Sequence, residues 1–177
     1  LKLFDLIIPT GIFIVILIIL LVVGISNSVN LSDGLDGLAS GMMVTSITPF
    51  ILIALKNNEF NIAIILITLV GSLCAFLVFN IHPAKIFMGD CGSLSLGAII
   101  SFSGILLHEY LTLFISCSFF IIETISVIVQ VLYYKKTKKR IFLMAPFHHH
   151  LEKKGIPEWK IVMSCWMIGI ITSIICI

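Results

Sequence analysis

The sequence predicts an all-α protein, a polytopic bundle of transmembrane helices that forms a single domain over residues 1–177. Of its 177 residues, 59% are hydrophobic and only 11% are charged, and the mean hydropathy is +1.20. A soluble domain would carry about twice that share of charge, because polar groups must cover its surface. The net charge of +2 is too small to indicate nucleic acid as a partner, so lipid is the expected solvent.

Five to six apolar segments account for this composition, each near the roughly 20 residues that a spanning helix needs. They are residues 7–25, 38–55, 62–81, 94–107, 111–134 and 161–177. Pro49 predicts a kink in the second segment. The fourth is short, so we expect it to be either tilted or extended by the Gly and Ser residues before it. Four of the five cysteines lie in or beside apolar runs, and we interpret them as small packing residues.

The connections between these segments predict which side of the membrane each faces. Three of them, residues 26–37, 80–93 and 135–160, are long or rich in motifs, and they alternate with two short ones. The three contain nine of the 11 basic residues: Lys85, Lys135, Lys136, Lys138, Lys139, Arg140, Lys153, Lys154 and Lys160. The positive-inside rule places them on the cytoplasmic side. The basic run at 135–140 is compatible with a topology anchor alone and with binding of anionic lipid head groups.

The first polar loop carries Asn27, Asn30, Asp33 and Asp36 directly after an apolar span. Such residues cost desolvation energy there unless they meet ions, water or a ligand. A helix cap followed by a turn would use the same residue types, but a cap needs only one of them. We therefore interpret this loop as part of a functional site.

The second polar loop sets Asp90 between glycines at the start of a predicted helix. Its carboxylate can supply an oxygen ligand to Mg²⁺, a metal that keeps waters and substrate phosphates as its other ligands. The backbone amides after Gly92 and Ser93 can face an anion. Phe87 lies beside this carboxylate, and an isolated aromatic there is more often a packing residue than a platform for a base.

The third polar loop contains His148, His149 and His150 in a row. Consecutive residues do not share a helix face, so hydrogen bonding to a phosphate or sugar is favoured over a metal site. Inside the fifth span, Glu123 and Gln130 are seven residues apart and share a face. An ionisable residue within a span indicates function by default, and a hydrogen bond that joins two helices is the alternative.

These motifs together resemble the phospho-N-acetylmuramoyl-pentapeptide-transferase family. They are residues 30–39 (Asn-Leu-Ser-Asp-Gly-Leu-Asp-Gly-Leu-Ala), 87–94 (Phe-Met-Gly-Asp-Cys-Gly-Ser-Leu) and 145–150 (Ala-Pro-Phe-His-His-His). The wider superfamily of polyprenyl-phosphate N-acetylhexosamine-1-phosphate transferases shares the aspartate-rich loops. The histidine run, followed by Glu152, Glu158 and Trp166, is similar to the muramoyl-pentapeptide branch.

The resemblance implies a Mg²⁺-dependent transfer of phospho-N-acetylmuramoyl-pentapeptide from UDP to undecaprenyl phosphate. The products would be UMP and lipid I, the first lipid-linked precursor of peptidoglycan in cell-wall biogenesis. It also implies a multi-pass protein of the bacterial inner membrane, surrounded by membrane lipids, with its active site facing the cytoplasm and with a homodimer as the assembly. The family has ten spans, and this chain would supply the C-terminal half.

The resemblance also implies residue roles by position. Asp90 would bind the metal, and Asp33, Asp36 and His149 would join it in the catalytic centre. Phe87 would stack on uracil. The implied substrate-binding residues are Asn27, Asn30, Asn80, Phe87, Gly89, Gln130, His148, His149 and His150.

The sequence departs from the family pattern at several points. Cys91 stands where the family usually has Thr, and Leu151 stands where an aromatic is common. The adjacent aspartate pair of the family is absent from these 177 residues, so we expect the chain alone to be inactive.

Two other functions compete with this one. A related transferase that uses UDP-N-acetylglucosamine would share the first two loops, but the histidine loop argues against it. An ion-coupled transporter could use Glu123 and the loop aspartates, but it would need more polar residues within the spans.

Overall fold

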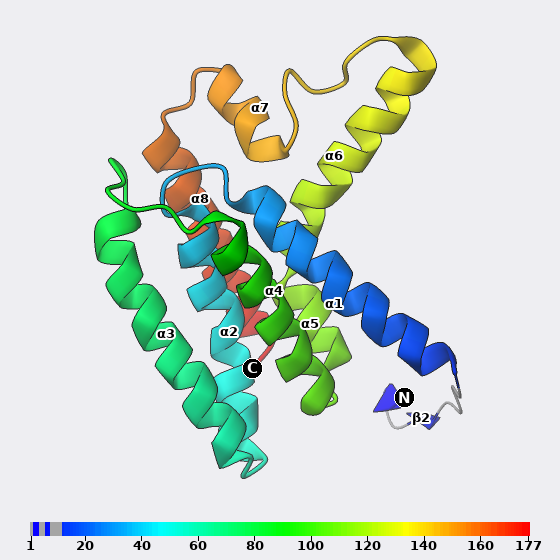
Figure 1. The fold of residues 1–177 in the computed structure, drawn as a ribbon, viewed down its shortest axis with the longest axis vertical. Coiled ribbons are helices and arrows are strands. Elements are labelled where there is room, and N and C mark those ends of the chain that lie inside the picture. Colours follow the sequence, from blue (N-terminus) through cyan, green and yellow to red (C-terminus); the bar gives the residue numbers. More distant parts are fainter. Residues whose placement is uncertain (1, 4–5, 8–11) are drawn as a thin grey trace.

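The computed structural model describes residues 2–3, 6–7 and 12–177, and in these ranges the chain is almost entirely helical (Figure 1). The helices are α1 (Phe13–Ser32), α2 (Leu38–Lys56), α3 (Phe60–Asn80), α4 (Gly89–Leu106), α5 (Tyr110–Ser116), α6 (Ser118–Thr137), α7 (Phe147–Lys153) and α8 (Glu158–Ile175). Two short strands, β1 (Lys2–Leu3) and β2 (Leu6–Ile7), pair antiparallel before α1. Among the described helices, six are long and apolar enough to cross a membrane, which confirms the polytopic bundle.

Helix α2 forms the centre of the bundle. It packs against α3 on one side and α8 on another, while α1 packs against α4 and α6. In α2, 61% of an 18-residue apolar stretch is buried inside the protein. In α3, which lies at the edge of the bundle, the share is 17% (Figure 1). The side chains of Met42, Met43, Ile47 and Phe50 on α2 are fully buried and make the middle of the core. Pro49 lies within α2, and the kink expected there stays a prediction.

The first and fifth spans differ from the predicted bounds. Helix α1 continues to Ser32, so residues 26–32 are helical and not a loop. Ser28 and Ser32 each donate a side-chain hydrogen bond to a carbonyl four residues earlier, which lets polar residues continue the helix. Residues 8–11 of the expected first span lie outside the described residues. The fifth span is two helices, because α5 ends at Ser116 and α6 begins at Ser118.

The predicted alternation of the connections is visible in the structure. The connections at 33–37 and 81–88 and the segment around α7 lie at one end of the bundle, at the top of Figure 1. The short turns at 57–59 and 107–109 lie at the opposite end. Of the two explanations for the short fourth span, extension is correct, since α4 begins at Gly89 and includes the Gly and Ser residues.

A side chain of helix α8 packs tightly against α2 at Gly41. The indole of Trp166 occupies the place that a Cβ at Gly41 would need, and its Nε1 donates a hydrogen bond to the Gly37 carbonyl (3.2 Å). We expect Gly41→Ala to lower the free energy of unfolding by about 1–3 kcal/mol, because the added methyl group overpacks this contact. Thermal unfolding of the purified protein in detergent measures the effect.

Gly71 in α3 is the matched control, since a Cβ there would meet no atom within 4 Å. Gly71→Ala is expected to be neutral or stabilising by up to about 1 kcal/mol, because Ala favours a helix over Gly. Equal melting temperatures for the Gly41 and Gly71 variants would contradict the close contact between α2 and α8.

Candidate active site

A polar cleft of about 270 Å³ opens where the first two polar segments meet. Its walls come from the end of α1, the connection to α2, the end of α3 and the start of α4. The lining residues are Asn30, Asp33, Gly34, Leu35, Asp36, Asn80, Phe87, Gly89 and Asp90. Residues about 60 positions apart therefore face the same space, as their implied roles require.

Asp90 is held in this cleft by Asn30. The Asn30 Nδ2 donates to Asp90 Oδ1 (2.9 Å) and also lies 2.9 Å from the Ser93 hydroxyl. The Ser93 hydroxyl donates to the Gly89 carbonyl (2.9 Å). Asn30 lies in the last turn of α1 and Asp90 in the first turn of α4, so this contact fixes the two helices at the cleft.

A second carboxylate, that of Asp33, lies close enough to feel the charge of Asp90. The pKa of Asp33 is raised, mainly by burial and further by Asp90, while a backbone hydrogen bond from Gly89 opposes the shift. Two neighbouring carboxylates that repel each other form a site that a cation would neutralise. This donor set fits a hard divalent cation such as Mg²⁺, which prefers oxygen ligands.

Asn80 lines the cleft and joins two of its segments. Its side chain is buried, and its Oδ1 accepts hydrogen bonds from the Gly37 backbone (3.2 Å) and the Ser40 hydroxyl (2.7 Å). Its Nδ2 donates to the Ile86 carbonyl (3.0 Å). Asn80 therefore connects the first polar segment to the second, and its amide is occupied by protein groups.

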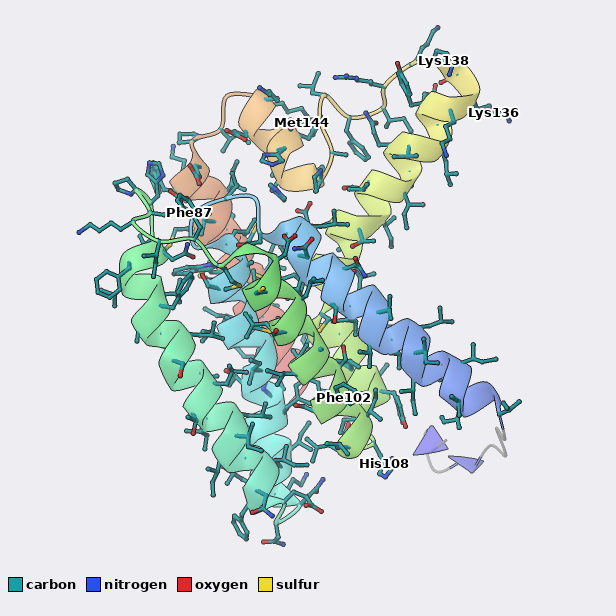
Figure 2. The ribbon with its side chains drawn as sticks, in the orientation of Figure 1. Phe87, Phe102, His108, Lys136, Lys138 and Met144 are labelled. Carbon is teal, nitrogen blue, oxygen red and sulfur yellow. The ribbon has the colours of Figure 1, made fainter. Side chains whose placement is uncertain are left out.

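Phe87 stands at the rim of the cleft. Its side chain is 77% exposed, and it projects from the loop between α3 and α4 (Figure 2). An exposed aromatic face beside a polar cleft is suited to stacking on a flat ring. This geometry distinguishes Phe87 from a core residue, which the sequence alone left as the commoner alternative.

The third polar segment contacts the first through two histidines, which lie against Gly34 in the wall of the cleft. A Cβ built at Gly34 would lie 2.5 Å from His148 Nε2 and 3.0 Å from His149 Nε2, so both rings press against the backbone of the first segment. The two rings are 4.3 Å apart between centroids. Two of the three consecutive histidines face one neighbouring segment, because α7 presents both rings from its first turn, whereas His150 faces Leu143.

Glu123 positions His148 from inside the bundle. Both side chains are fully buried, with exposed fractions of 0% for His148 and 1% for Glu123. The Glu123 Oε2 accepts the backbone N–H of His148 (3.3 Å) and lies 3.2 Å from its Nδ1, within ion-pair range although poorly aligned for a hydrogen bond. Within the described residues, His148 Nε2 has no hydrogen-bonding partner. That buried nitrogen faces Gly34, one of the residues that line the cleft.

Other predicted site residues lie elsewhere. Gln130 uses its side-chain amide on the backbone of residues 141 and 142, and His150 accepts the Leu143 N–H (3.1 Å). Both residues therefore hold the segment that leads into α7. Asn27 does not line the cleft; its Nδ2 donates to the Val23 carbonyl (2.8 Å) one turn back in α1.

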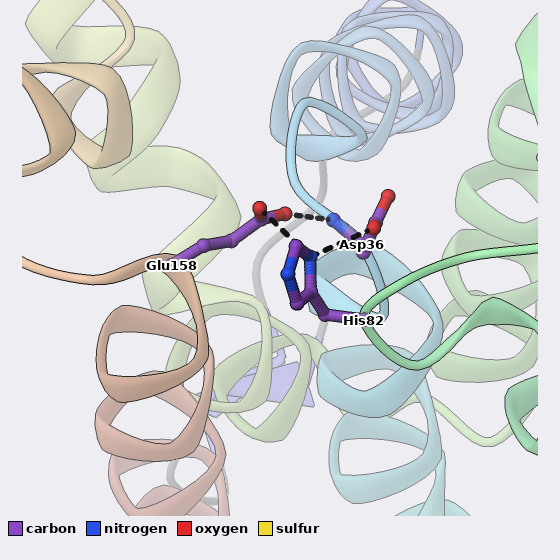
Figure 3. Close-up of side chains that lie close together, drawn as sticks. All are labelled: Asp36, His82 and Glu158. Carbon is purple, nitrogen blue, oxygen red and sulfur yellow. Dashed lines mark hydrogen bonds and ion pairs between the residues drawn. The ribbon is translucent and has the colours of Figure 1, made fainter.

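The sequence assigned no role to two residues that hold Asp36. The Glu158 Oε1 accepts the Asp36 backbone N–H (2.7 Å), and His82 Nδ1 lies 3.1 Å from Asp36 Oδ2 (Figure 3). Asp36 Oδ2 also accepts the Ala84 N–H (3.0 Å). A separation of 122 residues between Asp36 and Glu158 leaves no periodic signal that could have predicted this contact.

Comparisons with known proteins agree with the three motifs. The chain is 51% identical over 159 residues to the phospho-N-acetylmuramoyl-pentapeptide-transferase of Levilactobacillus brevis, which covers 90% of this chain and 49% of that protein. It is 48% identical to the enzyme of the same name from Lactiplantibacillus plantarum, over 93% of this chain and 51% of the relative. For Bacillus thuringiensis the identity is 45% over 90% of the chain. The chain thus spans about half the length of the curated relatives it matches.

These relatives confirm the resemblance that the motifs indicated. The sequence profile described as glycosyl transferase family 4 matches residues 1–108, which include the whole lining of the cleft. The chain therefore belongs to the glycosyl transferase family 4.

Proposed function

We propose that the protein transfers phospho-N-acetylmuramoyl-pentapeptide from UDP to undecaprenyl phosphate, giving lipid I and UMP. The observation that carries this proposal is the meeting of three separate polar segments at one cleft: Asn30 contacts Asp90, and His148 and His149 lie against Gly34. A phosphosugar transferase agrees with the family and with the names of the relatives.

Asp90 is the proposed ligand of Mg²⁺, with Asp33 beside it. Bound there, the cation would neutralise phosphate charge and help to align the two phosphates. The chain's own residues supply the rest. Asn30 orients the Asp90 carboxylate, and the Asp33 carboxylate adds negative charge that favours a cation over a bare phosphate.

The histidines are the proposed donors to the sugar-linked phosphate. His148 Nε2 and His149 Nε2 converge on Gly34, which lines the cleft, and Glu123 and Glu152 lie within ion-pair range of the Nδ1 atoms of the two rings. Donors that are fixed before substrate binds stabilise developing charge without reorganisation. Phe87 at the rim is the proposed platform for uracil, and Asp36 is proposed to line the nucleotide pocket.

A second cavity is suited to the lipid substrate. It has a volume of about 710 Å³ and lies along α6. Lys135, Lys138 and Arg140 are its basic residues, while Val127, Val131 and Met144 are apolar. A lipid phosphate with a long apolar chain needs this pairing of charge and hydrocarbon. We propose that this cavity, which Gln130 also lines, receives the polyprenyl phosphate.

The proposal includes the orientation and assembly of the protein. Lys85, the basic run at 135–140 and the lysines near α7 and the start of α8 lie in segments at the end of the bundle that carries the cleft, so the positive-inside rule faces the cleft toward the cytoplasm of a bacterium. We also propose a homodimer in the inner membrane. Because the chain spans about half of its relatives, we expect the 177-residue segment by itself to show no turnover.

A substrate comparison tests this function. The intact protein, purified in detergent with undecaprenyl phosphate and Mg²⁺, is supplied either with UDP-N-acetylmuramoyl-pentapeptide or with UDP-N-acetylglucosamine, and lipid-linked product is measured. We expect product and UMP from the first sugar nucleotide and at least about 100-fold less from the second, since a site built for one polar substrate rejects an analogue that leaves its groups unpaired. Equal rates, or preference for the second nucleotide, would assign the protein to the related transferases.

A further inference from the structure

Asp36, His82 and Glu158 bring three possible metal ligands together outside the pair formed by Asp33 and Asp90. One ligand atom from each residue lies within 4.8 Å of the others. His82 Nδ1 is 3.1 Å from Asp36 Oδ2 and 3.1 Å from Glu158 Oε2 (Figure 3). We propose that these residues form a second metal site, which binds a borderline transition-metal dication, with Zn²⁺ as its representative.

The spacing of the ligand atoms agrees with this assignment. A tetrahedral ion with bonds of about 2.0–2.1 Å places its ligands about 3.3 Å apart. The two distances from His82 Nδ1 are 3.1 Å, so a small movement of these partly exposed side chains would seat the ion. One imidazole nitrogen with two carboxylate oxygens suits Zn²⁺ better than Mg²⁺, which prefers oxygen alone.

The charge of the cluster favours a dication. Two carboxylates with a neutral imidazole carry two negative charges, which one Zn²⁺ ion neutralises. Within the described residues, no lysine or arginine forms an ion pair with Asp36 or Glu158. The alternative is that no metal binds and a protonated His82 bridges both carboxylates. The zinc titration described below distinguishes these two arrangements.

The surroundings already hold the ligands in place. The Ala84 N–H donates to Asp36 Oδ2 (3.0 Å), and the Asp36 N–H donates to Glu158 Oε1 (2.7 Å). Such bonds behind the ligands orient them and strengthen metal binding. The side chains of Asp36, His82 and Glu158 are 20%, 49% and 24% exposed, so water can reach the ion and supply a fourth ligand.

The site would clamp three segments that are distant in sequence. Asp36 belongs to the connection between α1 and α2, His82 to the loop between α3 and α4, and Glu158 begins α8. Asp36 also lines the cleft, so an ion here would stiffen one wall of it. The proposed role is structural and concerns the shape of the cleft.

Zinc titration of the intact protein tests the proposal. The protein is stripped with a chelator, supplied with millimolar Mg²⁺ to fill oxygen-only sites, and titrated with Zn²⁺ by calorimetry. We expect His82→Ala and Glu158→Gln each to weaken Zn²⁺ binding by at least about 10- to 100-fold, since loss of an outer-shell partner already costs that much. The Gln variant keeps an acceptor for the Asp36 N–H, so it changes charge with little change in shape.

Two control variants sharpen the result. His108→Ala removes a histidine at the opposite end of the bundle (Figure 2), and Asp90→Asn alters the proposed magnesium site. Both are expected to bind Zn²⁺ as the unaltered protein does. X-ray absorption at the zinc edge should show a nitrogen and oxygen shell at about 2.0–2.1 Å and no sulfur shell near 2.3 Å.

Three outcomes would overturn the site. These are equal Zn²⁺ affinity in His82→Ala and the unaltered protein, displacement of Zn²⁺ by millimolar Mg²⁺, or a sulfur shell, which would assign the ion to a cysteine. None of these readouts depends on transferase activity. The zinc site and the proposed function can therefore fail separately.

Discussion

Asp90→Asn is expected to lower Mg²⁺-dependent lipid I synthesis by about 100- to 1,000-fold, the range seen when one fixed electrostatic contact to a transition state is lost. Asparagine keeps the Oδ1 that accepts the hydrogen bond from Asn30 (2.9 Å) and removes only the charge. The fold should therefore persist, and the loss should reflect weaker stabilisation of the phosphates. Initial rates at saturating substrate over a range of Mg²⁺ concentrations measure it.

The Mg²⁺ dependence separates this effect from general damage. In the variant, the Mg²⁺ concentration for half-maximal rate should rise, while the melting temperature without Mg²⁺ should not fall, because two repelling carboxylates become one. Glu59→Gln is the control, since Glu59 is exposed in the turn between α2 and α3 at the other end of the bundle. An Asp90→Asn protein with an unchanged rate and an unchanged Mg²⁺ requirement would remove Asp90 from the metal site.

Glu123→Ala is expected to cost about 3–5 kcal/mol of folding free energy, because it leaves a cavity inside the bundle and removes the acceptor of a buried backbone N–H. Glu123 is 1% exposed, and its Oε2 faces both the backbone N–H and the Nδ1 of His148. In the alanine variant, the backbone N–H of His148 would be left without an acceptor in a dry environment. Chemical or thermal unfolding in detergent measures the change.

Two further variants identify the cause of that loss. Glu123→Gln keeps the shape and one acceptor oxygen, so it should cost less than Glu123→Ala while still reducing turnover through His148. Glu59→Ala, which removes an exposed carboxylate, should leave stability within about 0.5 kcal/mol. If Glu123→Ala were as stable as Glu59→Ala, the pairing with His148 would not contribute to the fold.

The sequence was sufficient to predict the helix bundle. It also predicted that the polar segments lie together at one end of that bundle. Long apolar segments specify spanning helices directly, because a backbone in lipid must satisfy its own hydrogen bonds. The position of Asp90 between glycines likewise predicted the start of α4. The proximity of Asn30 to Asp90 followed only from the sidedness of the loops, and the structure confirms that proximity. The roles of these residues in catalysis stay predictions.

The features that sequence analysis missed depend on contacts between distant segments. Helix α1 extends to Ser32 because serine hydroxyls donate hydrogen bonds to helix carbonyls. Serine is also common in turns, so the sequence did not predict this extension. The shared approach of His148 and His149 to Gly34 depends on how α7 docks. No local pattern encodes the distance between Asp36 and Glu158, which meet only when α8 packs beside the connection between α1 and α2.

That late contact has a consequence for biogenesis. Glu158 accepts a hydrogen bond from the Asp36 backbone and Trp166 packs against Gly41, and both residues belong to α8, which is synthesised after the helices whose residues line the cleft. Earlier spans can enter the membrane during translation, but one wall of the cleft lacks its final support until α8 inserts. A nascent chain that is stalled before α8 would therefore hold its aspartates in an unfinished cleft, which delays formation of a competent site until α8 has inserted.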